Sequence, residues 1–184
     1  MVTDRDRKVI EFIEKFNVAT TNIVAELFYP SLRVAQNRLK RLTEDKVLKR
    51  DRDHFTNQYL YYLKKPKQLN HCLLLVEFYQ KVSKYVDIEY YDKEVTIENL
   101  RADGLMIYRY RSKKYIAFIE VQISNIPVDI DKYRKLYLSE KYKKYFPVFP
   151  KLIVISNKKM PDNQDFKIIK ISEDLNNIQD IIPS

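Results

Sequence analysis

The chain contains a single glycine, Gly104, among its 184 residues, whereas glycine makes up about 7% of an average protein. Loops that cradle phosphate groups need several glycines at fixed spacing, so the sequence excludes a P-loop and a GxGxxG dinucleotide fold. Turns must be built from Asn, Asp, Ser and Pro instead. The one glycine directly follows Asp103, where a missing Cβ lets backbone or a ligand approach closely. We therefore expect Gly104 to mark a carboxylate site.

Other scarce residues narrow the possibilities further. One cysteine, Cys72, excludes an intramolecular disulfide, and two histidines are too few for a zinc-ligand cluster. Hydrophobic residues make up 45% of the chain, enough for a packed core. The N-terminus is charged from residue 4 onward, and no window approaches 18 consecutive apolar residues. We expect a soluble cytoplasmic protein that does not enter a membrane.

The positive charge is unevenly distributed. Lys and Arg number 34 and Asp and Glu 25, a net charge of +9. Residues 1–69 hold 15 basic and 9 acidic residues, and the remainder holds 19 and 16. A basic N-terminal third attached to a nearly balanced remainder indicates a nucleic-acid-binding module joined to a second domain.

The pattern of apolar residues predicts two domains and a linker. Thr3, either Thr20 or Thr21, and Ser31 can each cap one of three short amphipathic helices, the third with Leu32 facing inward. A β-hairpin follows over 47–51 and 58–63. This order is typical of a winged helix-turn-helix over 1–63, with a linker at 64–69. Residues 70–184 predict an α/β domain with a mixed sheet. Its elements are helices at about 70–85 and 129–145, β-rich segments between 86 and 123, and buried strands at 151–156 and 166–171.

The third helix carries the residue types that read DNA. In a helix-turn-helix this helix lies in the major groove, where Arg or Lys can contact guanine and Asn or Gln can pair with adenine. One face of it, at i, i+3, i+4 and i+7, holds Arg33, Gln36, Asn37 and Lys40. Basic residues placed for phosphate contacts are Arg41, Lys49, Arg50 and Arg52. We therefore predict sequence-selective binding of double-stranded DNA.

Two carboxylates mark a possible catalytic or metal site in the second domain. If Ser112 and Lys113 form a two-residue turn, Asp103 pairs with Gln122 and Leu105 pairs with Glu120. Side chains alternate along a strand, so Asp103, Glu120 and Gln122 emerge on one face. Two carboxylates at adjacent strand ends could bind Mg²⁺, a hard cation that takes oxygen ligands, and Glu77 could complete the acidic group.

The segments RADGLMIY (101–108) and AFIEVQI (117–123) resemble the PD-(D/E)XK nuclease-like superfamily. The resemblance implies a restriction-endonuclease-like domain, with Asp103, Glu120 and Gln122 in the catalytic positions. Ala102 stands where the motif has proline, and Gln122 stands where it has the lysine that orients water and stabilises charge. Glutamine supplies no charge, so the resemblance implies a degenerate site that needs no cofactor; Mg²⁺ is expected only if the site is active.

The combination of both halves, with LNHCLLLVEFY at 69–79 between them, resembles the replication-relaxation family of plasmids, phages and integrative elements. That resemblance spans about residues 5–157. It implies a DNA-binding protein in replication, maintenance, transfer or transcriptional control of a mobile element, acting without catalysis. A homodimer and contacts with replication or transfer proteins are expected with it.

Two alternative functions stay open. One is a Mg²⁺-dependent nuclease or nickase targeted by the winged helix, and the other is a protein-interaction adaptor. Lysines and tyrosines also alternate over 129–145, where they could follow a phosphate backbone and stack on unpaired bases. We favour the simpler interpretation that the rings are buried and the lysines solvated. These lysines are Lys132, Lys135, Lys141, Lys143 and Lys144.

Overall fold

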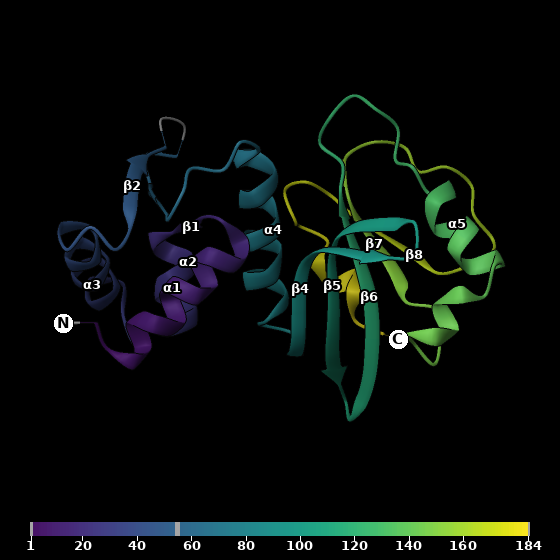
Figure 1. Ribbon diagram of the computed structural model, residues 1–184, viewed down its shortest axis with the longest axis horizontal. Helices are drawn as coiled ribbons and strands as arrows, with labels where there is room; N and C mark the ends of the chain where they lie inside the picture. The colour runs from purple at the N-terminus through teal and green to yellow at the C-terminus, as the bar shows by residue number, and fades with distance from the viewer. Residues whose placement is uncertain (1, 54–55, 184) are drawn as a thin grey trace. The chain divides into compact units, whose positions relative to one another are not determined.

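The computed structural model describes residues 2–53 and 56–183, and its contacts divide the chain into two compact units, 1–80 and 81–184 (Figure 1). The fold is mixed α/β, as the sequence predicts. The helix α4 (Leu69–Val82) contributes most of its length to the first unit. The sequence instead assigns it to the second domain, and that division into folding domains stays a prediction. Among the described residues, no helix is long and apolar enough to cross a membrane.

Three helices open the first unit, each begun by a side-chain cap. The Thr3 hydroxyl accepts from the N–H of Asp6 at 3.2 Å, and the Asp6 carboxylate accepts from the N–H of Thr3 at 2.7 Å, a reciprocal capping box. Thr20 caps the second helix by accepting from Ile23 N–H at 3.3 Å, which settles the choice between Thr20 and Thr21. The helices are α1 (Asp4–Phe16), α2 (Thr21–Phe28) and α3 (Leu32–Glu44).

A small antiparallel sheet completes this unit. Its strands lie in the order β1-β3-β2, so the hairpin predicted from the sequence is extended by a short strand that precedes α2. Its strands are β1 (Ala19–Thr20), β2 (Lys49–Arg52) and β3 (Tyr59–Tyr62). The inward placement of Leu32 is wrong, because that side chain is 46% exposed at the first turn of α3.

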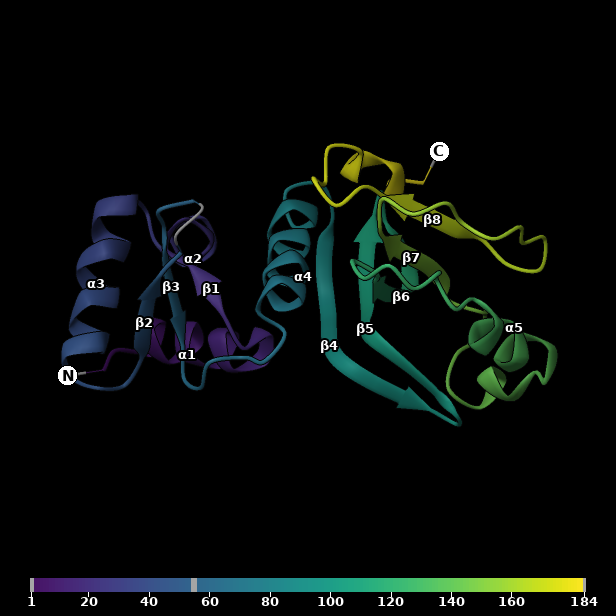
Figure 2. The ribbon, with the colours of Figure 1, turned by 90° about the horizontal axis from the view of Figure 1, so that it is seen from above.

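The second unit is built on one mixed sheet of five strands (Figure 2). The strands lie in chain order; the first three are antiparallel, and β6, β7 and β8 are parallel. They are β4 (Asp87–Ile97), β5 (Leu100–Tyr110), β6 (Lys113–Val121), β7 (Lys151–Ile155) and β8 (Ile168–Ile171). A short 3-10 turn, η2 (Ile178–Ile181), follows β8.

The helix predicted over 129–145 is shorter than expected. Helix α5 (Asp131–Leu138) ends where Glu140 takes a left-handed backbone with φ of 52°, and a 3-10 turn, η1 (Lys141–Lys144), follows. The Ser139 hydroxyl donates to the carbonyl of Leu136 at 3.1 Å, which satisfies a helix-end carbonyl at this break. The buried side of α5, Tyr133 and Leu136, belongs to the same apolar cluster as Phe118 of β6.

The turn between β5 and β6 also differs from the prediction. Both Arg111 and Ser112 have positive φ, 45° and 65°, so they form the two-residue turn in place of Ser112 and Lys113. Gly104 consequently pairs with Ile119, a register two residues away from the predicted one. A shift of two residues preserves the facing direction of every side chain, so the predicted face survives the error.

Candidate functional site

Helix α3 presents a polar face opposite its buried one. Ser31 caps it by accepting from Val34 N–H at 3.4 Å, and Ala35, Leu39 and Leu42 are buried. Every residue predicted for DNA contact is exposed: Arg33, Gln36, Asn37, Lys40 and Arg41 on α3, and Lys49, Arg50 and Arg52 on β2. Lys40 lies 3.7 Å from Glu44, an exposed pair that constrains it weakly.

A buried ion pair holds α3 against the other two helices. Asp6 of α1 is fully buried, and the Arg38 guanidinium of α3 donates to both of its oxygens, Nε to Oδ1 at 3.1 Å. The hydroxyl of Tyr29, just after α2, donates to Oδ1 at 2.9 Å. Burial acts to raise the pKa of Asp6, but the hydrogen bonds from Arg38, Thr3 and Tyr29 hold it well below the usual range. Arg38 was not predicted as a structural residue, because only its contact with Asp6 of a different helix distinguishes it from the exposed cations near it in the sequence.

The hairpin of β2 and β3 adds an aromatic residue that the sequence analysis also missed. Arg52 pairs with Tyr59 across the hairpin, and the Tyr59 ring is 39% exposed. The guanidinium carbons of Arg50 and Arg52 lie 4.7 and 5.9 Å from its centroid, within the range of cation–π attraction. Because side chains alternate along a strand, Arg50 and Arg52 lie on one face of the hairpin. The pairing of Arg52 with Tyr59 could have been predicted from this alternation only if the register of the hairpin had been known.

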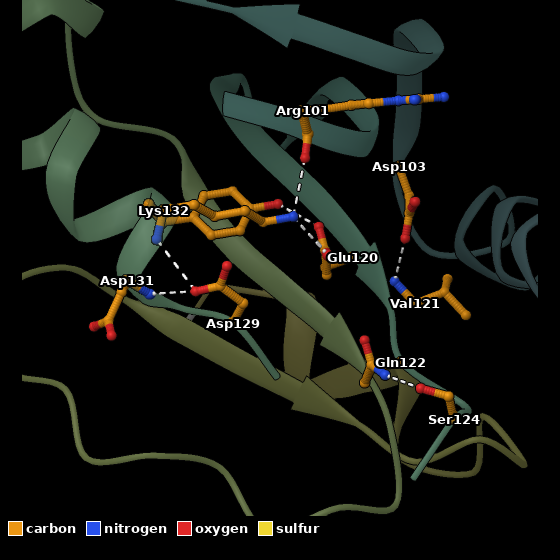
Figure 3. Close-up of polar contacts among 10 residues, drawn as sticks. Arg101, Asp103, Glu120, Val121, Gln122, Ser124, Asp129, Asp131 and Lys132 are labelled. Carbon is orange, nitrogen blue, oxygen red and sulfur yellow. Dashed lines mark hydrogen bonds and ion pairs between the residues drawn. The ribbon is translucent and has the colours of Figure 1, made fainter. Parts of the chain in front are cut away.

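The two carboxylates of the second unit lie close enough to interact. The Asp103 carboxylate accepts from the N–H of Val121 at 2.7 Å, one residue beyond Glu120 (Figure 3). Glu120 Oε1 accepts from Lys132 Nζ at 2.7 Å, and Oε2 accepts from the Tyr133 hydroxyl at 2.6 Å. Burial, and then the negative charge of Asp103, raises the pKa of Glu120, although the hydrogen bonds from Lys132 and Tyr133 act the other way.

Lysine reaches this site from α5 and not from the strand. Gln122, in the position that the resemblance assigns to lysine, donates to the hydroxyl of Ser124 (Figure 3). The ammonium of Lys132 instead bridges Glu120 and the backbone carbonyl of Arg101, at 2.9 Å from the latter. The sequence analysis assigned Lys132 to a solvated face, but its side chain is only 26% exposed. A lysine that folds back from a helix leaves no local sequence signal.

As arranged, the residues do not fit a bound Mg²⁺. Each oxygen of Glu120 already accepts a hydrogen bond, from Lys132 and from Tyr133, so a divalent cation would meet the positive charge of Lys132 at this carboxylate. Over residues 2–53 and 56–183, no three His, Cys, Asp or Glu side chains form a group that could hold a metal ion. The suggested third carboxylate, Glu77, lies on α4 among the residues of the first unit.

Gly104 has a structural explanation. A Cβ on this residue would lie 2.8 Å from the Tyr91 hydroxyl oxygen and 3.1 Å from its Cζ. Tyr91 is buried on the neighbouring strand β4, and its ring fills the space that the missing Cβ leaves. The close approach predicted from the sequence exists, and a side chain of the protein makes it.

Comparisons of the chain with protein-family models, with curated proteins and with solved structures give no match.

Proposed function

We propose that this protein is a sequence-selective double-stranded DNA-binding protein whose second unit is non-catalytic. The observation that carries the proposal is the polar face of α3, where Arg33, Gln36, Asn37 and Lys40 are all exposed opposite a buried apolar stripe. These are the side chains that pair with guanine and adenine in the major groove. The buried bond between Arg38 and Asp6 supports the same function, because it fixes the orientation of this helix.

The first unit is interpreted as a winged helix-turn-helix, with β2 and β3 as the wing. In this arrangement α3 enters the major groove and the hairpin lies over adjacent backbone. Lys49, Arg50 and Arg52 are then phosphate contacts, which fix the register without reading sequence. The exposed ring of Tyr59 lies within cation–π range of both arginines and limits their freedom, so less entropy is lost when they bind phosphate.

The second unit is interpreted as a degenerate restriction-endonuclease-like domain that serves dimerisation or a partner. Glu120 is neutralised by Lys132 from within the chain, and Gln122 supplies no charge. With the replication-relaxation resemblance, this supports a role in replication, maintenance, transfer or transcriptional control of a plasmid, phage or integrative element. A homodimer would present two copies of α3 to two half-sites.

A footprint on DNA flanking the gene, run with the full chain, tests the proposal. We expect protection of a defined site, lost in the double variant Arg33→Ala/Asn37→Ala, while weak salt-sensitive binding remains. Each lost base contact corresponds to about 1–3 kcal/mol of discrimination. Arg7→Ala/Asn70→Ala is the matched control, since both residues are exposed and lie off α3. An unchanged footprint in the α3 variant would overturn the proposal.

A Mg²⁺-dependent nuclease or nickase is the second candidate, favoured by one observation. The Lys132 ammonium at Glu120 supplies the positive charge that Gln122 lacks. The same footprint with added Mg²⁺ separates the two candidates. Strand breaks that vanish in Asp103→Asn support the nuclease, and protection without breaks supports the non-catalytic protein. If neither protection nor strand breaks are observed, the protein-interaction adaptor is the function that remains.

A further inference from the structure

A pocket of about 440 Å³ lies beside the carboxylate site, between the turn that joins β4 to β5 and the segment containing α5 and η1. Three lysines line it, Lys132, Lys135 and Lys141, together with the carboxylates Glu98 and Asp129. Leu100 and Leu136 form its apolar part. Ligand pockets have volumes of about 300–1,000 Å³ with a few placed polar groups, and this one falls in that range.

The acidic side chains of the pocket already have donors within the chain. Glu98 Oε1 accepts from the Tyr145 hydroxyl at 3.1 Å and from Lys144 Nζ at 3.5 Å. Asp129 Oδ1 accepts from the backbone N–H groups of Asp131 and Lys132, at 3.1 and 3.4 Å, in the first turn of α5 (Figure 3). Among the residues that the structure describes, neither carboxylate accepts a hydrogen bond from the ammonium of Lys132, Lys135 or Lys141.

The lysines, by contrast, hold more N–H groups than the chain uses. Each ammonium has three donors and no acceptor. Lys132 uses two of them, on Glu120 and on the Arg101 carbonyl. Lys141 lies 3.9 Å from Glu98, too far for a hydrogen bond, and the ammonium of Lys135 has no partner among the residues that the structure describes. The pocket is thus a concave surface with surplus donors.

We propose that this pocket binds a phosphate group. A phosphate carries only acceptor oxygens on its charged face, so it complements ammonium groups whose donors are unused. Asn99 and Ser139 also line the pocket: the side-chain amide of Asn99 can add a neutral donor, whereas the Ser139 hydroxyl already donates to the carbonyl of Leu136. Lys132 belongs to the pocket and to the Glu120 site at once, so a bound phosphate would lie next to the carboxylate pair.

Two sources share this chemistry: a free nucleotide and a phosphate of a nucleic-acid backbone. The second source rests on the proposed DNA-binding function, whereas the first does not. The pocket and α3 share no residue, so each can be disabled separately.

The test compares two double variants of the full chain that lose the same charge. Lys135→Gln/Lys141→Gln removes two pocket lysines. Lys143→Gln/Lys159→Gln removes two exposed lysines that do not line the pocket. The probes are AMP, with adenosine as its phosphate-free control, and a 20-base-pair duplex of arbitrary sequence. Affinity is measured by calorimetry, and the Ser139 amide resonance reports the location of binding.

For one of the two probes, we expect the affinity of the pocket variant to be at least tenfold lower than that of the control variant. If that probe is AMP, with no binding of adenosine, the source is a free nucleotide. If it is the duplex, and the duplex shifts the Ser139 resonance, the source is a nucleic-acid backbone. Equal affinities of the two variants for both probes would overturn the proposal. The Arg33→Ala/Asn37→Ala variant should retain the Ser139 response, which separates failure of this pocket from failure of the DNA-reading helix.

Discussion

Asp6 in the first unit and Glu120 in the second are both removed from water, yet their pKa values move in opposite directions. Asp6 is fully buried and accepts hydrogen bonds from Arg38, Thr3 and Tyr29, which lower its pKa although burial opposes this. The side chain of Glu120 is 12% exposed and has two donors, but burial and the charge of Asp103 raise its pKa. The difference lies in the balance of opposing effects: at Asp6 the hydrogen bonds outweigh burial, whereas at Glu120 burial and then the charge of Asp103 outweigh the two hydrogen bonds.

This contrast separates a carboxylate that builds the fold from one that is held at an energetic cost. The partners of Asp6 come from α1, from the end of α2 and from α3, so its charge joins three helices. Glu120 stays near Asp103 although that charge disfavours its ionised form. Perturbed pKa values occur both at functional sites and in structural ion pairs, and Glu120 is the residue on which the nuclease alternative depends.

The largest expected effect comes from removing the charge of Asp6. Asp6→Asn leaves the Arg38 guanidinium without its counter-charge in a mostly buried position, where its side chain is 22% exposed. Breaking one partner of a buried ion pair destabilises by about 3–5 kcal/mol. Urea unfolding followed by circular dichroism measures the change.

Asp4→Asn is the matched control for that variant, because Asp4 lies two residues before Asp6 in the first turn of the same helix. Its carboxylate is 90% exposed and lies 3.3 Å from Arg7, so it should lose at most about 1 kcal/mol. Equal losses in the two variants would remove the structural role that the comparison assigns to Asp6.

Local signals made much of the fold predictable. Thr3, Thr20 and Ser31 were identified from the sequence as candidate caps, and each begins its helix in the structure. The continuous apolar segment at 151–156 became β7, a strand inside the sheet that is buried along most of its length. The segment at 166–171 contains β8, but its prediction as a buried strand is wrong in part, because β8 is an edge strand whose burial alternates and whose Lys170 is exposed.

What failed depended on contacts between segments distant in the sequence. The bond of Lys132 to Glu120 and the packing of Tyr91 over Gly104 join residues from separate elements, for which no periodicity gives a signal. The turn at Arg111 and Ser112 failed for another reason. Left-handed backbone is usually made by Gly or Asn, and in a chain with one glycine other residues must adopt it. The position of the turn between β5 and β6 could therefore not be predicted from residue type.

A smaller effect is expected from Gly104→Ala, which tests how tightly the surroundings of Asp103 are packed. The new Cβ would meet the Tyr91 hydroxyl oxygen at 2.8 Å, and Tyr91 is only 4% exposed, so it has little room to move. Overpacking of this kind destabilises by about 1–3 kcal/mol. Urea unfolding of the variant measures the loss.

Tyr91→Phe supplies the control, since it removes the atom nearest to the new Cβ and leaves the ring. We expect Gly104→Ala to lose less stability in the Tyr91→Phe background than in the wild-type chain. Equal losses in both backgrounds would mean that the ring is not what requires glycine here, and a ligand-related reason for Gly104 would regain support.

The smallest effect, and the most direct test of the comparison, is the sign of the pH dependence in each unit. A lowered pKa means that folded Asp6 releases its proton more readily than the unfolded chain, so its stabilisation is complete above the ordinary value of 3.8 and is lost as the pH falls below it. A raised pKa means the reverse for Glu120: the folded state binds the proton more tightly, so stability falls as the pH rises from 4.5 through the raised value.

Amide hydrogen exchange, corrected for intrinsic rates, measures this dependence separately in α1 and in β6. In α1, exchange should become slower as the pH rises through the acid range. In β6, exchange should become faster as the pH rises above 4.5. Glu120→Gln should flatten only the β6 profile, because glutamine does not titrate. A β6 profile that keeps its slope in that variant would show that Glu120 is not the carboxylate held at a cost, and the contrast with Asp6 would fail.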